Sequence, residues 1–254
     1  MRLVVLVKQV PDPTGPRRLD PGDATLARDD ADAVVGPLDL HGLGAALTLR
    51  EEHGGTVTAL TVGPARAAAA LRHALATGAD RAVHVSDPAL HGACAPQTSA
   101  VLAAALRRVG FDLVLGGAAS ADGGLGVMAA LLAERLDVPH LSGLRTLAVA
   151  GTTVTGERRT EDGWWELAAE LPAVVSTEEL PGAPRRRTVA GIRAAQTRPL
   201  TTWTLADLGI DPATVGLAAA TTRVVAVDTR TAPPAGRTGD VAELVGLLAA
   251  RALV

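Results

Sequence analysis

The chain has 254 residues, of which 48% are hydrophobic and 20% charged, with a formal net charge of -3 at pH 7. This composition fits a globular α/β protein with a sizeable core, and the interspersed charges argue against a broad nucleic-acid surface. Aromatic residues make up only 2%, which excludes a base-stacking platform, and the single cysteine excludes an internal disulfide or a multi-cysteine metal centre.

The first half of the chain alternates strand-like and helix-like segments. Four apolar runs have the character of strands covered on both faces. They span residues 3–7, 56–62, 81–85 and 111–116. Four segments with helical spacing and glycine or proline boundaries follow these strands. They span residues 38–53, 65–77, 95–109 and 124–136, the first of them after a proline-rich excursion at 11–22. This alternation predicts a parallel, doubly covered sheet.

After Pro139 the pattern changes to short segments punctuated by glycines, which predict antiparallel strands that extend or flank the sheet. These segments are 144–150, 152–158, 164–171 and 173–178. Residues 180–200 read as an exposed loop that leads into a short helix. We therefore predict a domain over 1–204 and a C-terminal arm over 205–254, which packs on its own domain or on another chain. Within the arm we expect a strand at 223–227 and a helix near 239–251.

No targeting or membrane segment is expected. The N-terminal apolar run is short and is soon followed by Pro11, which favours a first strand over a secretion signal. No stretch of about 18 uninterrupted apolar residues occurs, so we expect no membrane insertion. The lone Cys94 favours a reducing compartment, and we expect a cytoplasmic protein.

The glycine-rich stretch 116–128, between a predicted strand and a predicted helix, is a candidate phosphate site. Glycines let the backbone approach a phosphate closely, and Asp122 is placed to cap the following helix. An ordinary glycine-rich turn is an equal alternative, because G-x-G-x-x-G is absent. Gly63-Pro64 repeats the strand-to-helix turn at the same predicted sheet edge, where a plain helix start is equally compatible.

Lys8, the only lysine, directly follows the first strand and so lies near the same edge. A Walker A motif is impossible without G-K-[ST], and a solvated or paired lysine is the alternative to a functional one. The six histidines lack zinc spacing and G-x-S-x-G is absent, so we expect neither a metal site nor a hydrolase triad. The run Arg185-Arg186-Arg187 fits an acidic partner, a phosphate or a solvated loop.

Several segments together resemble the β subunit of electron transfer flavoprotein. They are VLVKQVPD at 5–12, ALATGADRAVHV at 74–85, DLVLGG…ADGGLG within 112–126, ELPAVVSTEEL at 170–180, APRRRTVAGI at 183–192 and TLADLGID at 204–211. The resemblance implies an α/β fold of the adenine-nucleotide hydrolase-like, Rossmann-like type without hydrolase chemistry. It also implies a larger α subunit that holds most of the FAD, and an AMP or a second FAD bound in this subunit. The chain is similar to a specialised actinobacterial-type paralogue.

Matching the family's motifs residue by residue gives a set of expected nucleotide contacts. They are Leu6, Lys8, Gly36, Val62, Gly63, Asp122, Gly123, Gly124, Leu125, Gly126, Val127 and Met128. Many family members read D-G-D-T-G-Q-V where this chain reads D-G-G-L-G-V-M, and N-P-F-D where this chain has G-P-L-D at 36–39. Several side-chain hydrogen bonds to the nucleotide are therefore absent, which weakens the expectation of AMP.

The family's partner-recognition loop corresponds to residues within 180–195. The expected contacts there are Arg185, Arg186, Arg187, Val189 and Ile192. The resemblance implies a flavin-dependent dehydrogenase as electron donor and a quinone reductase or other acceptor downstream. The arm 205–254 is expected to pack on the α subunit. The chain is thus expected to be an electron-carrier subunit rather than an enzyme. The alternatives are a stand-alone adenine-nucleotide-binding protein or hydrolase, and a scaffolding pseudo-subunit.

Overall fold

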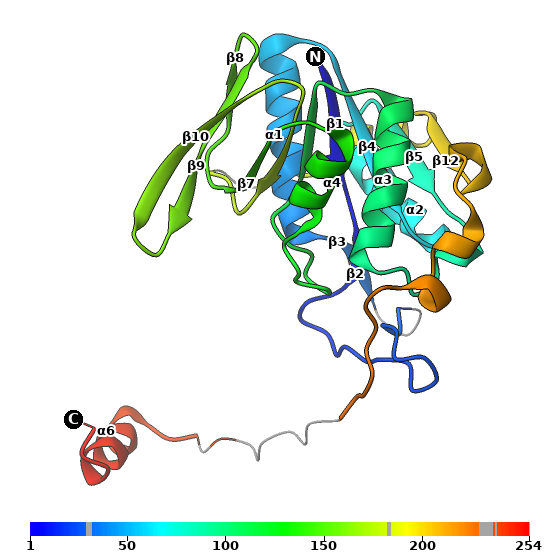
Figure 1. The fold of residues 1–254 in the computed structure, drawn as a ribbon. Helices are drawn as coiled ribbons and strands as arrows, with labels where there is room; N and C mark the ends of the chain where they lie inside the picture. The colour runs from blue at the N-terminus through cyan, green and yellow to red at the C-terminus, as the bar shows by residue number, and fades with distance from the viewer. Residues whose placement is uncertain (29–31, 182–183, 229–235, 237, 254) are drawn as a thin grey trace.

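A mixed β-sheet forms the centre of the structure, a computed structural model that describes residues 1–28, 32–181, 184–228, 236 and 238–253. Its strands are β1 Arg2–Leu6, β4 Thr56–Val62, β5 Arg81–Val85, β6 Leu113–Gly117, β7 His140–Leu144, β8 Ala148–Ala150, β9 Thr153–Thr160, β10 Gly163–Glu170, β11 Ala173–Thr177 and β12 Leu200–Trp203. In the described residues they pair in the order β10-β9-β7-β11-β6-β1-β4-β5-β12, with β8 beside β9 (Figure 1). Neighbours from β7 to β12 run parallel, and β8, β9 and β10 are antiparallel. The predicted α/β fold with an antiparallel extension is confirmed.

Helices cover both faces of this sheet. They are α1 Pro37–His53, α2 Ala68–Thr77, α3 Ala95–Val109, α4 Met128–Leu136 and α5 Val189–Ala195, with α6 Val241–Ala250 at the end of the chain. Leu3 and Val5 of β1 belong to a core cluster with α1, α2 and α5, whereas Val4 belongs to a second cluster with α3 and α4. This alternation along a buried strand gives each face its own core. Both cores consist chiefly of alanine, valine and leucine.

Two predicted elements differ from the structure in orientation or extent. The segment 173–178, expected to be antiparallel, forms β11, which lies between β6 and β7 and pairs in parallel with both. All five of its residues are buried, as is typical of a central parallel strand. Helix α4 begins at Met128 rather than near 124, because Gly124 and Gly126 have φ of 64° and 66°, outside the helical region.

Sequence patterns also missed short pairings. β2 Gln9–Pro11 and β3 Ala33–Val35 form a separate antiparallel pair, and the proline-rich stretch lies between them in the chain. β12 adds a parallel edge strand beside β5. The strand expected at 223–227 does not form, and Val225 there is 88% exposed.

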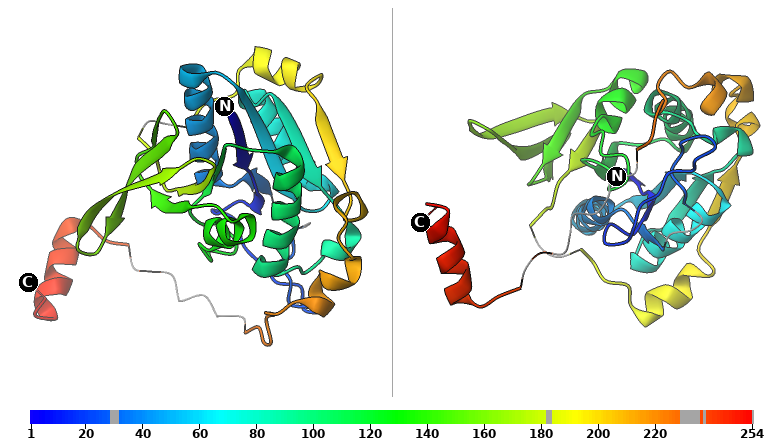
Figure 2. Two further views of the ribbon diagram at one scale, coloured as in Figure 1. Left: turned by 45° about the horizontal axis from the view of Figure 1, so that its top comes forward. Right: turned by 90° about the horizontal axis from the view of Figure 1, so that it is seen from below.

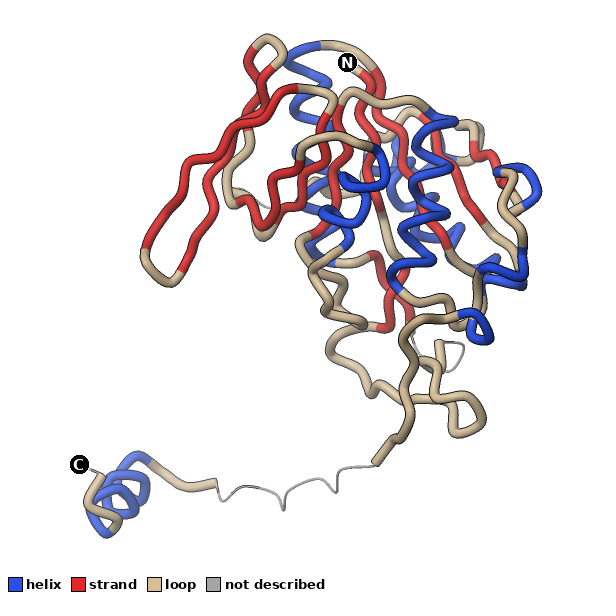
Figure 3. Tube along the Cα trace, in the orientation of Figure 1, coloured by secondary structure: helices blue, strands red, loops and turns tan. Residues whose placement is uncertain are grey.

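The antiparallel extension and the C-terminal region reach beyond the central layers. The β9–β10 hairpin projects away from the helices (Figure 3). It carries both adjacent tryptophans, Trp164 and Trp165, which are 57% and 53% exposed. Helix α6 stands apart from the sheet and its covering helices in Figure 1 and in the right view of Figure 2.

The first part of the predicted arm packs on the domain instead of leaving it. Three short 3-10 helices follow β12, at Ala206–Leu208, Pro212–Thr214 and Leu217–Ala219. Leu205 is fully buried, and the Gln97 side chain donates to the carbonyls of Thr214 and Gly216 at 3.3 and 3.2 Å. Of the predicted partner loop and arm, residues 182–183, 229–235, 237 and 254 lie outside the described residues. None of the helices in the described ranges has the length and apolar character needed to span a bilayer.

Candidate functional site

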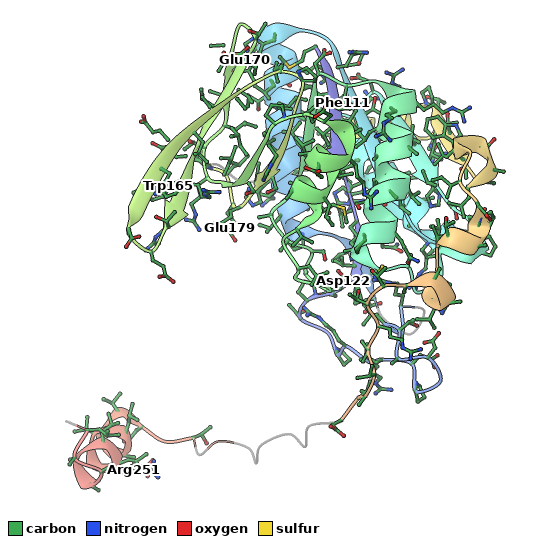
Figure 4. All side chains as sticks on the ribbon, in the orientation of Figure 1. Phe111, Asp122, Trp165, Glu170, Glu179 and Arg251 are labelled. Carbon is green, nitrogen blue, oxygen red and sulfur yellow. The ribbon has the colours of Figure 1, made fainter. Side chains whose placement is uncertain are left out.

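The carboxyl ends of the parallel strands bring the predicted nucleotide residues to one edge of the sheet. β1 pairs in register with both β4 and β6, so Lys8, Gly63 and the loop 118–127 follow strands that end side by side. The chain between β2 and β3, described over residues 12–28 and called the excursion from here on, lies next to this edge, close to the labelled Asp122 (Figure 4). Binding sites in parallel α/β folds favour this edge.

Lys8 and Asp122 form the centre of the site. Lys8 Nζ donates to Asp122 Oδ1 at 2.7 Å and to Ser120 Oγ at 3.4 Å. The other carboxylate oxygen of Asp122 accepts from Arg28 Nη2 at 2.6 Å. Only 2% of the Asp122 side chain is exposed. Its burial opposes ionisation, but the Lys8 and Arg28 cations outweigh it and hold the pKa of Asp122 well below its ordinary value. Asp122 is therefore a carboxylate that organises two cations.

The same carboxylate shapes the start of the glycine-rich loop. Gly123 N–H donates to Asp122 Oδ1 at 2.7 Å and to Ser120 Oγ at 3.2 Å. The expectation that Asp122 caps the following helix is wrong. The N-cap of α4 is Val127, which makes no side-chain cap hydrogen bond. Farther along the loop Leu125 is 67% exposed, so it is not packed into the protein.

A buried carboxylate, Asp39, ties three elements together beneath this loop. Its Oδ2 accepts the Lys8 N–H at 2.8 Å and its Oδ1 accepts the Gly117 N–H at 3.2 Å, so the first turn of α1 holds the ends of β1 and β6. A Cβ on Gly36 or on Gly117 would lie 2.6 Å from an Asp39 oxygen. Burial raises the pKa of Asp39 to about 7, although the two N–H groups and the Lys8 cation oppose that rise. Gly36 N–H also donates to the Lys8 carbonyl, at 2.8 Å.

The second predicted turn, at Gly63, is fixed from the neighbouring strand. His84 of β5 is 2% exposed, and its Nε2 lies 3.0 Å from the Gly63 carbonyl oxygen, to which it donates. Burial lowers the pKa of His84, which keeps the ring neutral at physiological pH. Leu6, Val62 and Met128 are partly buried and pack against the core cluster of α3 and α4. The structure thus assembles Lys8, Gly36, Gly117 and Asp122 directly, with Gly63 just after the end of the adjoining strand β4.

The predicted partner residues lie at a different part of the molecule. Arg185 forms a bidentate pair with Glu51 at 2.5 and 2.6 Å and donates to Thr48, both on α1. Glu51 is twelve positions after Asp39, which at 1.5 Å per residue places it about 18 Å along the helix from the nucleotide site. Arg186 and Arg187 are exposed, and so are Val189 and Ile192 of α5, at 69% and 47%. Arg185 therefore links its loop to α1, while Arg186 and Arg187 are exposed to solvent.

Sequence reasoning missed Arg28, Asp39, His84 and Ser120. Asp39 is the last residue of the G-P-L-D motif at 36–39, in which only Gly36 was predicted to contact the nucleotide. His84 lies on a strand that was predicted to be covered on both faces, and this predicted burial was the signal that its ring needs a hydrogen-bond partner. Among the described residues no group of His, Cys, Asp and Glu side chains is arranged to hold a metal ion.

Comparison with known proteins identifies the family of this chain. Residues 23–208 match the model of the electron transfer flavoprotein domain family. The chain is 44% identical to an electron transfer flavoprotein subunit beta of Mycobacterium leprae over 240 residues, covering 92% of this chain and 90% of that protein. It is 34% identical to a subunit beta of Thermoanaerobacterium thermosaccharolyticum over 254 residues (99% and 97%). It is also 36% identical to the Caffeyl-CoA reductase-Etf complex subunit CarD of Acetobacterium woodii over 226 residues (88% and 86%). The chain therefore belongs to the electron transfer flavoprotein family and has the character of its β subunit.

Proposed function

We propose that this β subunit pairs with a larger α subunit and supplies one wall of the cleft in which FAD is held, mainly by the α subunit. The pair relays electrons from a flavin-dependent dehydrogenase to a quinone reductase or another acceptor. The bound flavin supplies the redox chemistry, and this chain positions it and docks the donor, so the chain is a carrier subunit rather than an enzyme. The observation that carries the proposal is the Lys8–Asp122 cluster at the carboxyl edge of a sheet in a chain of this family.

The same edge is the proposed pocket for an AMP or a second FAD in this subunit. Lys8 is 41% exposed beside a glycine-rich loop, which suits the phosphate of either ligand. The contacts of Asp122 and Asp39 would hold Lys8 and Gly117 in place around that phosphate. The motif's missing threonine and glutamine would each have contributed about 0.5–1.5 kcal/mol. Binding must then rest on the cations and on the backbone N–H groups of residues 122–128.

Two exposed apolar surfaces are the proposed partner contacts. Val189 and Ile192, next to Arg186 and Arg187, would meet the dehydrogenase, and the arginines favour an acidic rim on that partner. Helix α6 has Val241, Leu244, Val245 and Leu247 exposed and no buried residue. Because an apolar helix gains stability only by burying such a face, we propose that the α subunit packs against α6.

Co-expression with an α subunit of this family tests the proposal in the cytoplasm of a bacterial host, the compartment that we propose. The expected product is a yellow 1:1 complex whose flavin accepts electrons from a dehydrogenase and passes them on. A variant that ends after residue 222 is expected to lose the complex while its domain still folds. A colourless monomer that turns over adenine nucleotides would support the hydrolase alternative. A 1:1 complex without electron transfer would support the scaffolding alternative.

A further inference from the structure

The excursion 12–28 is held against the nucleotide edge by one ion pair, from Arg28, and by a hydrogen bond between Asp23 and His91. Arg28, at its end, donates from Nη2 to Asp122 Oδ2 at 2.6 Å. Asp23 lies 2.6 Å from His91 Nε2, which anchors the middle of the excursion on the loop after β5. Arg28 is therefore held in a defined position at the glycine-rich loop, although it comes from a segment with few regular elements of its own.

The resulting cluster carries excess positive charge. Lys8 and Arg28 bring two cations to a single carboxylate, and each oxygen of Asp122 binds one of them. One N–H of the guanidinium binds Asp122 and another binds the Gln9 carbonyl oxygen at 3.4 Å, out of the five N–H groups that an arginine has. The Lys8 and Arg28 side chains remain 41% and 32% exposed, so solvent and a ligand can reach them. The cluster suits an anion beside the loop.

We propose that Arg28 is a second cationic recognition residue of the nucleotide pocket, which binds the ligand's phosphate together with Lys8. The inference rests on the proposed function and extends it. The preferred ligand is then an adenosine that carries phosphate, as the monoester of AMP or the diphosphate of FAD, and the bare nucleoside is rejected. A guanidinium matches the geometry of phosphate oxygens, so Arg28 replaces part of the binding lost with the motif's threonine and glutamine. Asp122 acts as a positioning residue that keeps the two cations side by side.

Affinity measurements on the full chain in complex with its α subunit test this assignment. AMP, FAD and adenosine are titrated by calorimetry into complex stripped of the pocket's nucleotide. Arg28→Gln is expected to weaken the binding of whichever phosphate ligand the pocket takes by about 10-fold to 100-fold, the range for a charge-assisted hydrogen bond, with adenosine changed by less than about twofold. Arg28→Lys, which keeps the positive charge but lacks the planar guanidinium, is expected to have an affinity between those of the parent and of Arg28→Gln. The AMP and FAD titrations show which of the two is the natural ligand.

Arg17→Gln is the matched control, because Arg17 lies exposed in the same excursion and its loss changes the charge equally. It is expected to leave all three affinities unchanged, and circular dichroism checks that each variant folds. If Arg28→Gln binds AMP, FAD and adenosine as the parent does, or loses affinity for all three equally, the inference about Arg28 is overturned while the proposed function stands. A parent complex that forms and transfers electrons but binds none of the three overturns the pocket and the inference together.

Discussion

Asp39 offers a test of how the nucleotide edge is built, because burial raises the pKa of its carboxyl to about 7 from 3.8. The folded state therefore binds this proton more tightly than the unfolded chain does. The stability that the protonated carboxyl contributes is fully present below the unfolded pKa and is lost as pH rises through the folded value. From these two pKa values, the contribution falls by about 2 to 3 kcal/mol between pH 5 and pH 8.

Asp39→Asn removes the titration while keeping the shape and one acceptor oxygen. The free energy of unfolding, measured by urea denaturation, is compared between variant and parent at pH 5, 6, 7 and 8. The variant is expected to be less stable at pH 5, since one of the Lys8 and Gly117 N–H groups loses its acceptor. Between pH 5 and pH 8 the difference in unfolding free energy should shift in favour of the variant by about 2 to 3 kcal/mol. Taking the difference cancels the other titrating groups.

Asp162→Asn, in the exposed turn between β9 and β10, is the control for losing a carboxyl elsewhere. Its difference from the parent should stay level over the same pH range. A level difference for Asp39→Asn as well, or one that moves in the opposite direction, would refute the reasoning that burial governs this carboxyl.

Two further substitutions test how neighbouring elements are held. Gly191→Ala places a Cβ 2.2 Å from the Ala76 carbonyl oxygen, so α5 must shift away from α2. We expect the free energy of unfolding in urea to fall by about 1–3 kcal/mol, despite the better helix propensity of alanine. Gly246→Ala, which has open space around it, is the control and should cause no loss. His84→Ala leaves the Gly63 carbonyl oxygen without its buried donor and opens a cavity. It should lower the unfolding free energy by about 2–4 kcal/mol and also weaken the binding of the pocket's AMP or FAD. Unchanged binding would show that the Gly63 turn lies outside the pocket.

Where local signals were complete, the sequence predicted the fold closely. The segments 56–62, 81–85 and 95–109 coincide with β4, β5 and α3. Each has a clear apolar period and ends at a glycine, a proline or a charged turn, so its boundaries are set within the segment itself. The predicted strand-to-helix turn at Gly63 and the placement of Lys8 at the same edge follow from this alternation.

The rest depends on contacts between distant parts of the chain. Arg28 and Asp122 are 94 positions apart, and no local period relates them. β12 contains only four residues and owes its existence to pairing with β5. One difference is local: α4 begins late because Gly124 and Gly126 have positive φ, which a helical apolar pattern does not reveal.

The most direct test of the account is to identify what the purified complex of this chain and its α subunit carries. The complex is denatured, and the released small molecules are identified by mass spectrometry and counted against each chain. The account predicts FAD for the α subunit and, in addition, an adenosine phosphate, as AMP or a further FAD, for each copy of this chain. A chain that stays alone and colourless on co-expression and releases no adenylate would contradict it.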